Sequence, residues 1–195
     1  VYKELDARYG EEGLTADEAR QLTELLDQVA GTVVYSTEHL LEPAYRVRPG
    51  DTLEMIAETY KVTPQLLAKI NGIRDPMSLE PGRELKVVRG PFDALVDLNR
   101  LELTLRLQGC YAGRFSIGTG NDFPQLEGSH TVREKMLGPT YYGLEETIGS
   151  DDPKNPLGKH WIGLDNRIGI HGTNDQRNVG ATSQRGVICL GDRDI

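Results

Sequence analysis

The chain has 195 residues, of which 37% are hydrophobic and 27% charged. This composition is typical of a folded globular protein with one or two domains. No run of about 18 apolar residues is present, which excludes a membrane-spanning helix. The net charge of −8 disfavours nucleic acid as a partner, because phosphate backbones are bound by basic surfaces. Two cysteines are too few for a disulfide framework.

The first segment, residues 1–43, is predicted to be helical. Thr15-Ala-Asp-Glu18 fits a capping box, in which Thr and Glu satisfy each other's backbone N–H groups. Apolar residues then recur at helical spacing. We expect Gly31 to end this helix and a short second helix to follow near residues 37–41. The segment is a spacer or docking hairpin, or a plain packing element, and periodicity does not separate these interpretations.

Residues 45–87 form a self-contained unit of alternating element types. A strand is predicted at its start, followed by a helix that Asp51 caps, with Glu54 completing a second capping box. Pro64 suits the first position of another helix, and a returning strand is predicted at 84–88. This strand-helix-helix-strand module of about 45 residues is close to the lower size limit for an independent fold.

This unit resembles a LysM domain in its sequence motifs. They are Tyr-Arg-Val-Arg-Pro-Gly-Asp-Thr-Leu from residue 45, Asn-Gly-Ile from residue 71 and Leu-x-Pro-Gly-x-x-Leu from residue 79. The resemblance implies a domain at 44–89 that binds N-acetylglucosamine-containing glycans in a shallow groove between two loops. The binding residues that it implies are Gly50, Asp51, Thr52, Leu53, Asn71, Gly72 and Ile73. Their backbone groups and short polar side chains suit acetamido and hydroxyl groups, and Asp51 and Asn71 are also expected to cap helices.

From Gly90 onward the sequence consists of short alternating runs broken by glycine. Residues 101–107 alternate strictly between apolar and polar, which predicts a strand with one buried face. Further strands are predicted at 111–117, 128–133 and 161–164. Several short strands with turn signals favour a β-sandwich or barrel. The whole chain is therefore predicted to be an α+β multidomain protein.

Two motifs near the end of the chain carry candidate chemistry. Residues 168–174 read Ile-Gly-Ile-His-Gly-Thr-Asn, and residues 183–190 read Ser-Gln-Arg-Gly-Val-Ile-Cys-Leu. Together with Ile-Gly-Thr-Gly from residue 117, Glu-Gly-Ser-His-Thr-Val from residue 127 and Asn-Pro-Leu-Gly from residue 155, they resemble the catalytic domain of L,D-transpeptidases (the YkuD family). The resemblance implies a mainly-β sandwich over residues 91–195. It also implies a truncated domain, because members of the family normally continue beyond the last residue of this sequence.

The family resemblance implies a cysteine acyltransferase that forms 3-3 crosslinks in peptidoglycan and needs no cofactor or metal. His171 is implied as the base, with Gly172 beside it and Gly186 as the tight approach before the nucleophile. A cysteine thiolate attacks a carbonyl of a stem peptide, and an amine of a neighbouring stem resolves the thioester. No His, Cys or carboxylate spacing typical of a zinc site is present.

The sequence departs from the family at the nucleophile itself. The family carries Cys sixteen residues after the His, where this chain has Val187, and Cys189 stands where the family usually has Arg. In an extended segment Cys189 faces the same side as Val187 but lies about 6.6 Å farther along the strand. A hydrogen bond to His171 needs about 3 Å, so a bulge would have to re-aim the thiol. The missing guanidinium suits a carboxylate, and either Arg185 or Arg193 is expected to replace part of it.

Three interpretations of this departure stay open. The first is catalysis by Cys189 and His171 in a rearranged site, the second a peptidoglycan-binding relative without catalysis, and the third a change introduced at Val187. Cys189 can also be a small buried hydrophobe, which is our interpretation of Cys110. The expected partners are peptidoglycan stem peptides and N-acetylglucosamine-containing glycan. The expected location is the bacterial cell envelope, inferred from function because no signal peptide is visible.

Overall fold

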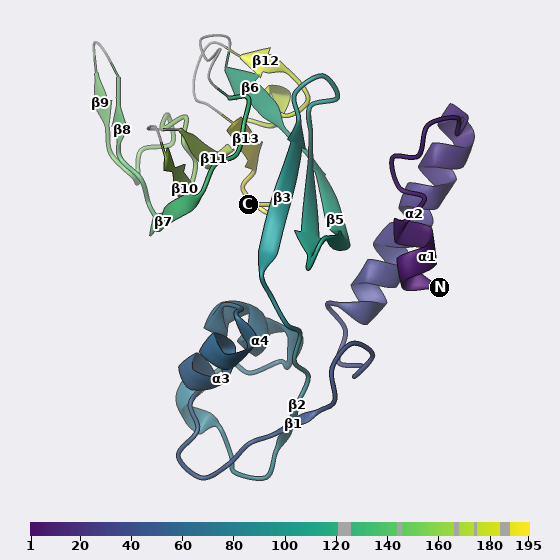
Figure 1. The fold of residues 1–195 in the computed structure, drawn as a ribbon. Helices are drawn as coiled ribbons and strands as arrows, with labels where there is room; N and C mark the ends of the chain where they lie inside the picture. The colour runs from purple at the N-terminus through teal and green to yellow at the C-terminus, as the bar shows by residue number, and fades with distance from the viewer. Residues whose placement is uncertain (121–125, 144–145, 166–167, 174, 184–187) are drawn as a thin grey trace. The chain divides into compact units, whose positions relative to one another are not determined.

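The computed structural model describes residues 1–120, 126–143, 146–165, 168–173, 175–183 and 188–195. The chain divides into two compact units. Unit 1 comprises Val1–Leu95 and Thr104–Arg114, and unit 2 comprises Val96–Leu103 and Phe115–Ile195. Figure 1 shows helices in the first part of the chain and strands in the second, so the predicted α+β class is confirmed. The predicted domain boundaries near residues 43 and 90 stay a prediction.

Unit 1 begins with two helices, α1 (Tyr2–Asp6) and α2 (Ala16–Val33). The capping box is confirmed: the Thr15 hydroxyl accepts from the Glu18 N–H, and the Glu18 carboxylate accepts from the Thr15 N–H at 2.9 Å. Gly31 does not end α2, which continues to Val33. The helix predicted at 37–41 is wrong, because these residues adopt no helical structure. The Ser36 hydroxyl instead accepts from the Glu38 N–H at 3.0 Å, a local bond that competes with a helical turn.

The LysM-like part of unit 1 has the predicted order of elements. They are β1 (Tyr45–Arg46), α3 (Leu53–Tyr60), α4 (Pro64–Ile70), the 3-10 helix η1 (Pro76–Ser78) and β2 (Glu84–Leu85). β1 and β2 pair antiparallel, with Tyr45 opposite Leu85. The predicted cap of α3 is wrong by one residue, because Thr52 is the N-cap and its hydroxyl accepts from the Met55 N–H.

One apolar core holds the end of α2 and the LysM-like elements together, and it includes Val34, Leu53 and Ile73. Lys86 is 1% exposed at the edge of this core. Its ammonium donates to the carbonyl of Val33 at 2.9 Å and also to the carbonyl of Glu38. The bond to Val33 satisfies a carbonyl at the C-terminal end of α2 that has no partner within the helix, and the bond to Glu38 holds the segment that follows the helix.

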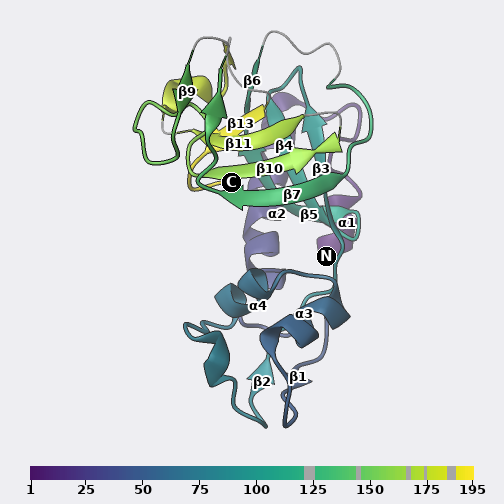
Figure 2. The ribbon, with the colours of Figure 1, turned by 90° about the vertical axis from the view of Figure 1, so that its left-hand side faces the viewer.

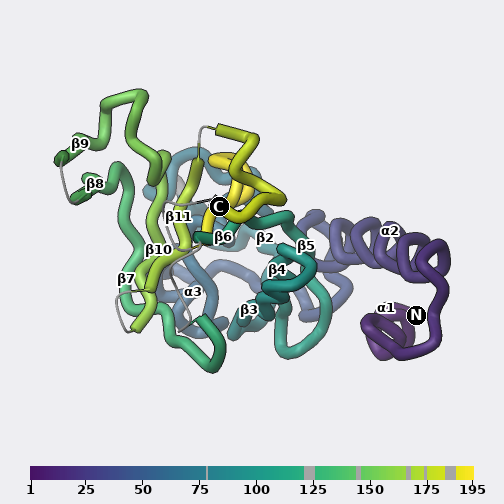
Figure 3. Tube along the Cα trace, turned by 90° about the horizontal axis from the view of Figure 1, so that it is seen from above, coloured from purple at the N-terminus to yellow at the C-terminus, as the bar shows by residue number. Residues whose placement is uncertain are grey.

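A three-stranded sheet of order β3-β4-β5 follows in the sequence. Its strands are β3 (Phe92–Asp97), β4 (Glu102–Leu107) and β5 (Cys110–Ser116). β4 and β5 lie within one residue of the strands predicted at 101–107 and 111–117. The single buried face predicted for 101–107 is wrong, because Leu103 and the adjacent Thr104 are both buried. Tyr111 of β5 is 1% exposed and packs against Leu26 and Ala30 of α2. Tyr9 also contacts Tyr111, with ring centroids 4.9 Å apart, and Figure 3 shows α1 folded back beside α2.

The described part of unit 2 contains a six-stranded mixed sheet of order β12-β6-β13-β11-β10-β7. Figure 2 shows β7, β10, β11 and β13 lying side by side. The strands are β6 (Gly118–Gly120), β7 (Val132–Leu137), β10 (His160–Leu164), β11 (Gly169–Thr173), β12 (Thr182–Ser183) and β13 (Ile188–Gly191). A hairpin of β8 (Tyr141–Tyr142) and β9 (Thr147–Ile148) and the 3-10 helix η3 (Gln176–Asn178) complete the unit. The strand predicted at 128–133 is misplaced, because β7 begins only at Val132.

None of the helices among the described residues is long and apolar enough to span a lipid bilayer.

Candidate functional site

The central strands of unit 2 bring His171 and Cys189 together. β11 and β13 pair in parallel, with His171 directly opposite Cys189. Neighbouring strands lie about 4.8 Å apart, and residues opposite each other project to the same face of the sheet. His171 is 3% exposed and Cys189 4% exposed. A base and a thiol therefore lie next to each other on one buried face.

A row of four residues crosses the sheet at this level. Trp161 of β10 lies opposite His171, and Gly118 of β6 lies opposite Cys189. The rings of Trp161 and His171 are nearly parallel, at 14°, with their centroids 6.3 Å apart. Gly169 gives the indole its room, because a Cβ at that position would lie 2.1 Å from the Trp161 ring. The sheet therefore holds the His171 imidazole beside the Trp161 indole.

The hydrogen bonding of His171 defines its tautomer. Nδ1 lies 2.7 Å from the carbonyl oxygen of Gly172, so Nδ1 carries the proton and donates it. Nε2 then carries the lone pair, and this buried atom has no hydrogen-bond partner among the described residues. This arrangement leaves Nε2 free to accept a proton, as a general base requires.

The electrostatics of His171 also favour a neutral base. Burial lowers the pKa of His171, while the Gly172 carbonyl and the charge of Asp192 oppose this shift. Asp192 can approach because Gly172 has no side chain: a Cβ there would lie 2.2 Å from its Oδ1. The imidazole is therefore uncharged near pH 7.

The Cys189 thiol is directed toward β6, which is the neighbour of β13 on the side away from β11. Sγ donates to the backbone carbonyl of Asn178 at 3.7 Å. A Cβ on Gly118 would lie 2.7 Å from Sγ and 1.9 Å from that carbonyl oxygen, so only glycine fits here. Burial raises the pKa of the Cys189 thiol, partly opposed by a hydrogen bond with the Gly118 backbone. Within the described residues the thiol and the imidazole are adjacent, uncharged and not hydrogen-bonded to each other.

The residues around Asn178 fix the position of this carbonyl. Asn178 belongs to η3, and its side-chain amide donates to the Thr173 hydroxyl at 3.4 Å. The same hydroxyl accepts from the Asp175 N–H at 3.2 Å. Thr173, the third residue of the His-Gly-Thr motif, thus anchors the turn that holds the thiol.

The structure brings only some of the predicted catalytic residues together. His171, Gly172 and Cys189 meet as described, whereas Arg185, Gly186 and Val187 lie outside the described residues. Trp161, Asn178 and Gly118 also belong to the site and are not among the residues predicted for it from the sequence. Asn178 acts through its backbone carbonyl, which gives no sequence signal. Gly118 lies in the Ile-Gly-Thr-Gly motif and Trp161 is the only tryptophan of the chain, so both positions carried a signal.

The predicted glycan loops of unit 1 are built mainly for rigidity. The Asn71 side chain accepts from the Lys86 N–H at 2.7 Å and donates to the carbonyls of Leu67 and Lys86. The Asp51 carboxylate accepts from the Tyr45 hydroxyl at 2.7 Å and from the Arg48 N–H at 2.8 Å. These bonds lower the pKa of Asp51, the backbone bond contributing most.

The remaining predicted loop residues offer mostly backbone. Leu53 and Ile73 are buried in the shared core, while Gly50 and Gly72 adopt positive φ angles that suit glycine. Thr52 is exposed and caps α3. Any ligand held here is therefore recognised largely by main-chain groups.

The other histidines of unit 2 lie apart from this pair in their bonding. Nδ1 of His130 lies 3.2 Å from a carboxylate oxygen of Asp165, within hydrogen-bonding distance. His160 has a buried Nδ1 without a partner among the described residues. No group of three or more His, Cys, Asp or Glu side chains that could hold a metal occurs in the described ranges.

Comparisons with known proteins agree on two families. Residues 45–88 match the model of the LysM domain. "Putative L,D-transpeptidase YkuD" of Bacillus licheniformis is 28% identical over 159 residues, which cover 77% of this chain and 88% of that protein. "Putative L,D-transpeptidase YqjB" of Bacillus subtilis is 33% identical over 114 residues, which cover 54% of this chain and 64% of that protein.

Among solved structures, L,D-transpeptidase 3 of Mycobacterium tuberculosis with a faropenem-derived adduct is similar with a TM-score of 0.43 and 18% identity. The match covers 56% of each chain, so this chain spans little more than half the length of that structure. The chain carries a LysM domain and is a homologue of the YkuD and YqjB L,D-transpeptidases.

Proposed function

We propose that this chain binds peptidoglycan through its LysM domain and that unit 2 transfers acyl groups between stem peptides to form 3-3 crosslinks. The observation that carries the acyl-transfer proposal is the parallel register of β11 and β13, which sets His171 beside Cys189 on one face. The unpartnered Nε2 supports the role of His171 as the base. The named L,D-transpeptidase relatives support the class of reaction.

The proposed reaction begins with a rotation of the Cys189 side chain. The thiol leaves the carbonyl of Asn178, turns toward β11 and gives its proton to Nε2 of His171. The thiolate forms a bond to the carbonyl carbon of the third stem residue, and the bond to the terminal D-Ala nitrogen breaks as His171 returns the proton to that amine. An amine of a neighbouring stem then attacks the thioester and releases the Cys189 thiol. Main-chain N–H groups stabilise the oxyanion formed in each step.

A pair that is neutral at rest suits this sequence of steps. Burial lowers the pKa of His171 and raises the pKa of Cys189, so both groups are favoured in their uncharged forms in the free protein. The LysM domain raises the local concentration of stem peptides around unit 2, because the wall polymer is immobile. We place the protein in the bacterial cell envelope because its proposed ligand and substrate, peptidoglycan, is located there.

A second candidate function is peptidoglycan binding without catalysis. The bond from the thiol to Asn178 and the raised pKa of Cys189 favour it, since a protonated thiol is a poor nucleophile. In this case Cys189 is a buried packing residue.

Turnover of isolated tetrapeptide stems separates the two candidates. We expect mass spectrometry to detect released D-Ala and 3-3 dimers with the wild-type chain, and neither product with Cys189→Ala. Cys110→Ala is the matched control and keeps activity. Binding to wall sacculi is expected to persist in all three proteins. Wild-type protein that binds sacculi but releases no D-Ala establishes the second candidate, and a Val187→Cys variant that then gains turnover identifies the missing nucleophile.

A further inference from the structure

A carboxylate lies in a narrow slot beside the backbone of β11. Asp192 directly follows β13, and its Oδ1 would lie 2.2 Å from a Cβ on Gly172 and 2.3 Å from a Cβ on Gly158. A side chain at either glycine would therefore displace the carboxylate. Oδ1 also accepts from the Lys159 N–H at 3.3 Å. The two glycines thus admit a carboxylate to the backbone of the residue that follows His171.

Both walls of this slot are held by bonds that do not involve Asp192. Gly172 lies within β11, which pairs with β10 on one side and with β13 on the other. Gly158 adopts a φ of +62°, which suits glycine. It belongs to a segment that Asn155 organises: this side chain is 2% exposed, donates to a backbone carbonyl at 2.8 Å and accepts from the Leu157 N–H at 2.9 Å. The slot is therefore preformed on both sides.

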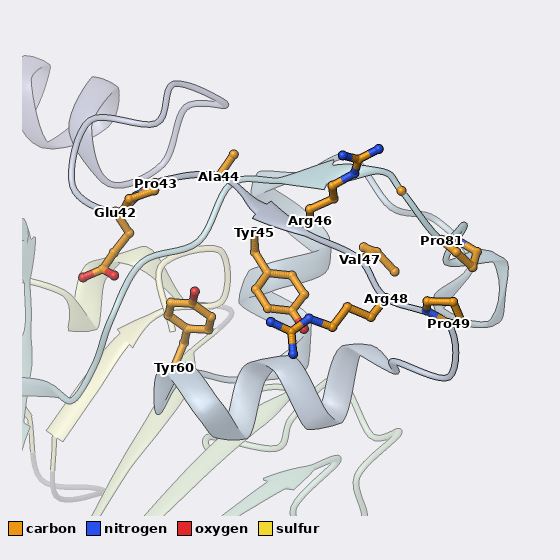
Figure 4. Close-up of a pocket in the computed structure, with 11 residues that line it drawn as sticks. Glu42, Pro43, Ala44, Tyr45, Arg46, Val47, Arg48, Pro49, Tyr60 and Pro81 are labelled. Atoms are coloured by element: carbon orange, nitrogen blue, oxygen red, sulfur yellow. The ribbon is translucent and has the colours of Figure 1, made fainter.

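No cation among the described residues forms an ion pair with Asp192. The hydrogen bond that it accepts from Lys159 comes from the uncharged backbone N–H. Glu42 of unit 1, at one end of the groove drawn in Figure 4, shows the contrasting arrangement, because it forms an ion pair with Arg89 at 3.2 Å. A carboxylate without an adjacent cation acts on groups farther away, since its field is not cancelled locally.

The other titratable groups around Asp192 are mostly in contact with water. They line an open pocket of about 480 Å³ that Asp192 shares with Asp151, Asp152, Lys159 and His160. Both of these aspartates and Lys159 are exposed, as are Arg193 and Asp194, which follow Asp192 in the chain. Water and salt screen such charges. His160 differs, because its Nδ1 is buried and has no hydrogen-bond partner among the described residues.

The face of the sheet that carries His171 provides few charges of its own. The neighbouring strands contribute Trp161 and Cys189 at the level of His171, and burial raises the pKa of the Cys189 thiol. The exposed Glu134 of β7 lies beyond Trp161, with Oε1 2.9 Å from the position of a Cβ on Gly163. The charge of Asp192, in contrast, reaches His171 through buried backbone.

The effect of this charge on His171 opposes the effect of burial. Burial is the largest influence and lowers the pKa of His171, whereas the Gly172 carbonyl and the charge of Asp192 raise it. Gly172 itself is buried, so little water lies between the carboxylate and the peptide that accepts from Nδ1. A negative charge in this position favours the protonated form of the ring.

We infer that Asp192 is a positioning residue for His171 and that its carboxylate stabilises the imidazolium formed during acyl transfer. The proton that leaves Sγ of Cys189 binds Nε2, so the ring becomes positively charged while Nδ1 keeps its bond to the Gly172 carbonyl. The carboxylate behind Gly172 lowers the free energy of this charged state. The inference rests on the proposed function, because His171 gains this proton only if it acts as the base.

NMR titration of the imidazole groups tests the electrostatic contact without requiring turnover. Asp192→Asn keeps the shape of the side chain and an oxygen for the Lys159 N–H but removes the charge. Asp194→Asn removes the same charge two residues farther along and is the matched control. The signals of His171 are assigned by their absence from His171→Gln. We expect the titration midpoint of His171 to lie at lower pH in Asp192→Asn than in wild type, and Asp194→Asn to match wild type.

The pH dependence of D-Ala release tests the catalytic role of the carboxylate. At pH 7, Asp192→Asn should release D-Ala about three- to tenfold more slowly than wild type, because a less basic imidazole is a weaker general base. The acidic limb of its rate profile should move to lower pH. Loss of a merely structural contact would leave the shape of the profile unchanged. Asp194→Asn should keep the wild-type rate and profile.

Equal titration midpoints of His171 in wild type and Asp192→Asn would overturn the inference. An equal shift in Asp194→Asn would also overturn it, since the effect would then come from the overall charge of the surface. A shifted midpoint with unchanged D-Ala release would reject the role of Asp192 in the reaction. If the wild-type chain releases no D-Ala, the proposed function fails and this role fails with it, whereas the NMR comparison still decides whether the carboxylate acts on His171.

Discussion

The LysM domain and the sheet of unit 2 treat their polar side chains in opposite ways. In the LysM domain, the side chains of Asn71 and Asp51 form hydrogen bonds within the domain. In unit 2, Nε2 of His171 is buried and has no hydrogen-bond partner. Among the described residues, Nδ1 of His160 is the other buried side-chain atom without such a partner. Leaving a buried polar group unpaired costs about 1–3 kcal/mol. The polar side chains of the LysM domain therefore stabilise its loops, whereas unit 2 leaves Nε2 of His171 available to accept a proton.

Replacing His171 gives the largest expected effect and separates the two regions by function. His171→Gln preserves size and polarity but cannot act as a base at Nε2. We expect release of D-Ala from tetrapeptide stems to fall by about 10²–10⁴-fold, while binding to wall sacculi is unchanged. His130→Gln is the matched control. A His171→Gln variant that stays within tenfold of the wild-type rate would remove His171 from the reaction.

Gly118→Ala tests how tightly the thiol is enclosed. The added Cβ would lie 1.9 Å from the carbonyl oxygen of Asn178, which is backbone and cannot move alone. We expect the free energy of unfolding of unit 2 to fall by about 1–3 kcal/mol in urea titrations. Gly149→Ala, where a Cβ meets nothing within 4 Å, is the control. Equal stability of the two variants would mean that the Asn178 carbonyl of η3 does not lie in close contact with Gly118 of β6.

Asn71→Ala tests the rigid side of the comparison. It removes two hydrogen bonds that join the end of α4 to Lys86 and one that caps the carbonyl of Leu67 within α4. The expected loss in the free energy of unfolding of unit 1 is about 1–2 kcal/mol, with stem-peptide turnover per folded molecule unchanged. The exposed Gln65→Ala on α4 should stay within about 0.5 kcal/mol of wild type. An Asn71→Ala protein as stable as Gln65→Ala would refute the structural role of this amide.

The smallest expected effect is a pH dependence of stability that arises from His171. Its folded-state pKa lies below the ordinary value of 6.5, so below pH 6.5 the unfolded chain binds a proton that the folded chain does not. Stability relative to His171→Gln is therefore full above this pH and is lost as pH falls, by at most about 1.4 kcal/mol per pH unit. Denaturation between pH 5 and 8 measures this difference. Parallel profiles for the two proteins would show that burial does not shift this imidazole.

The sequence predicted the local features of unit 1 well because they rest on short-range signals. The capping box at Thr15 and the proline that opens α4 each depend on a few neighbouring residues. Asp51 was assigned as the cap of α3 because Asp and Thr are both favoured there. The Asp51 carboxylate instead accepts from the Tyr45 hydroxyl and the Arg48 N–H, and Thr52 caps the helix.

The arrangement of the site in unit 2 could not be predicted because its strands lack a period-two signal. Residues 169–173 and 188–191 are buried along their whole length, and strands covered on both faces show no alternation. The parallel register that sets Cys189 beside His171 is a long-range property. Sequence spacing within one strand relates Cys189 to Val187, which lies outside the described residues, but contains no information on the neighbouring strand that carries His171.

The mass of a faropenem adduct tests most directly whether Cys189 is a nucleophile, because a nucleophilic thiol opens a β-lactam ring and keeps the acyl group as added mass. After incubation with faropenem, intact-mass analysis should show one added adduct on the wild-type chain and on Cys110→Ser, with peptide mapping placing it on Cys189. Cys189→Ser should remain unmodified. A wild-type chain of unchanged mass, or an adduct that persists in Cys189→Ser, would contradict the assignment of Cys189 and His171 as the reacting pair.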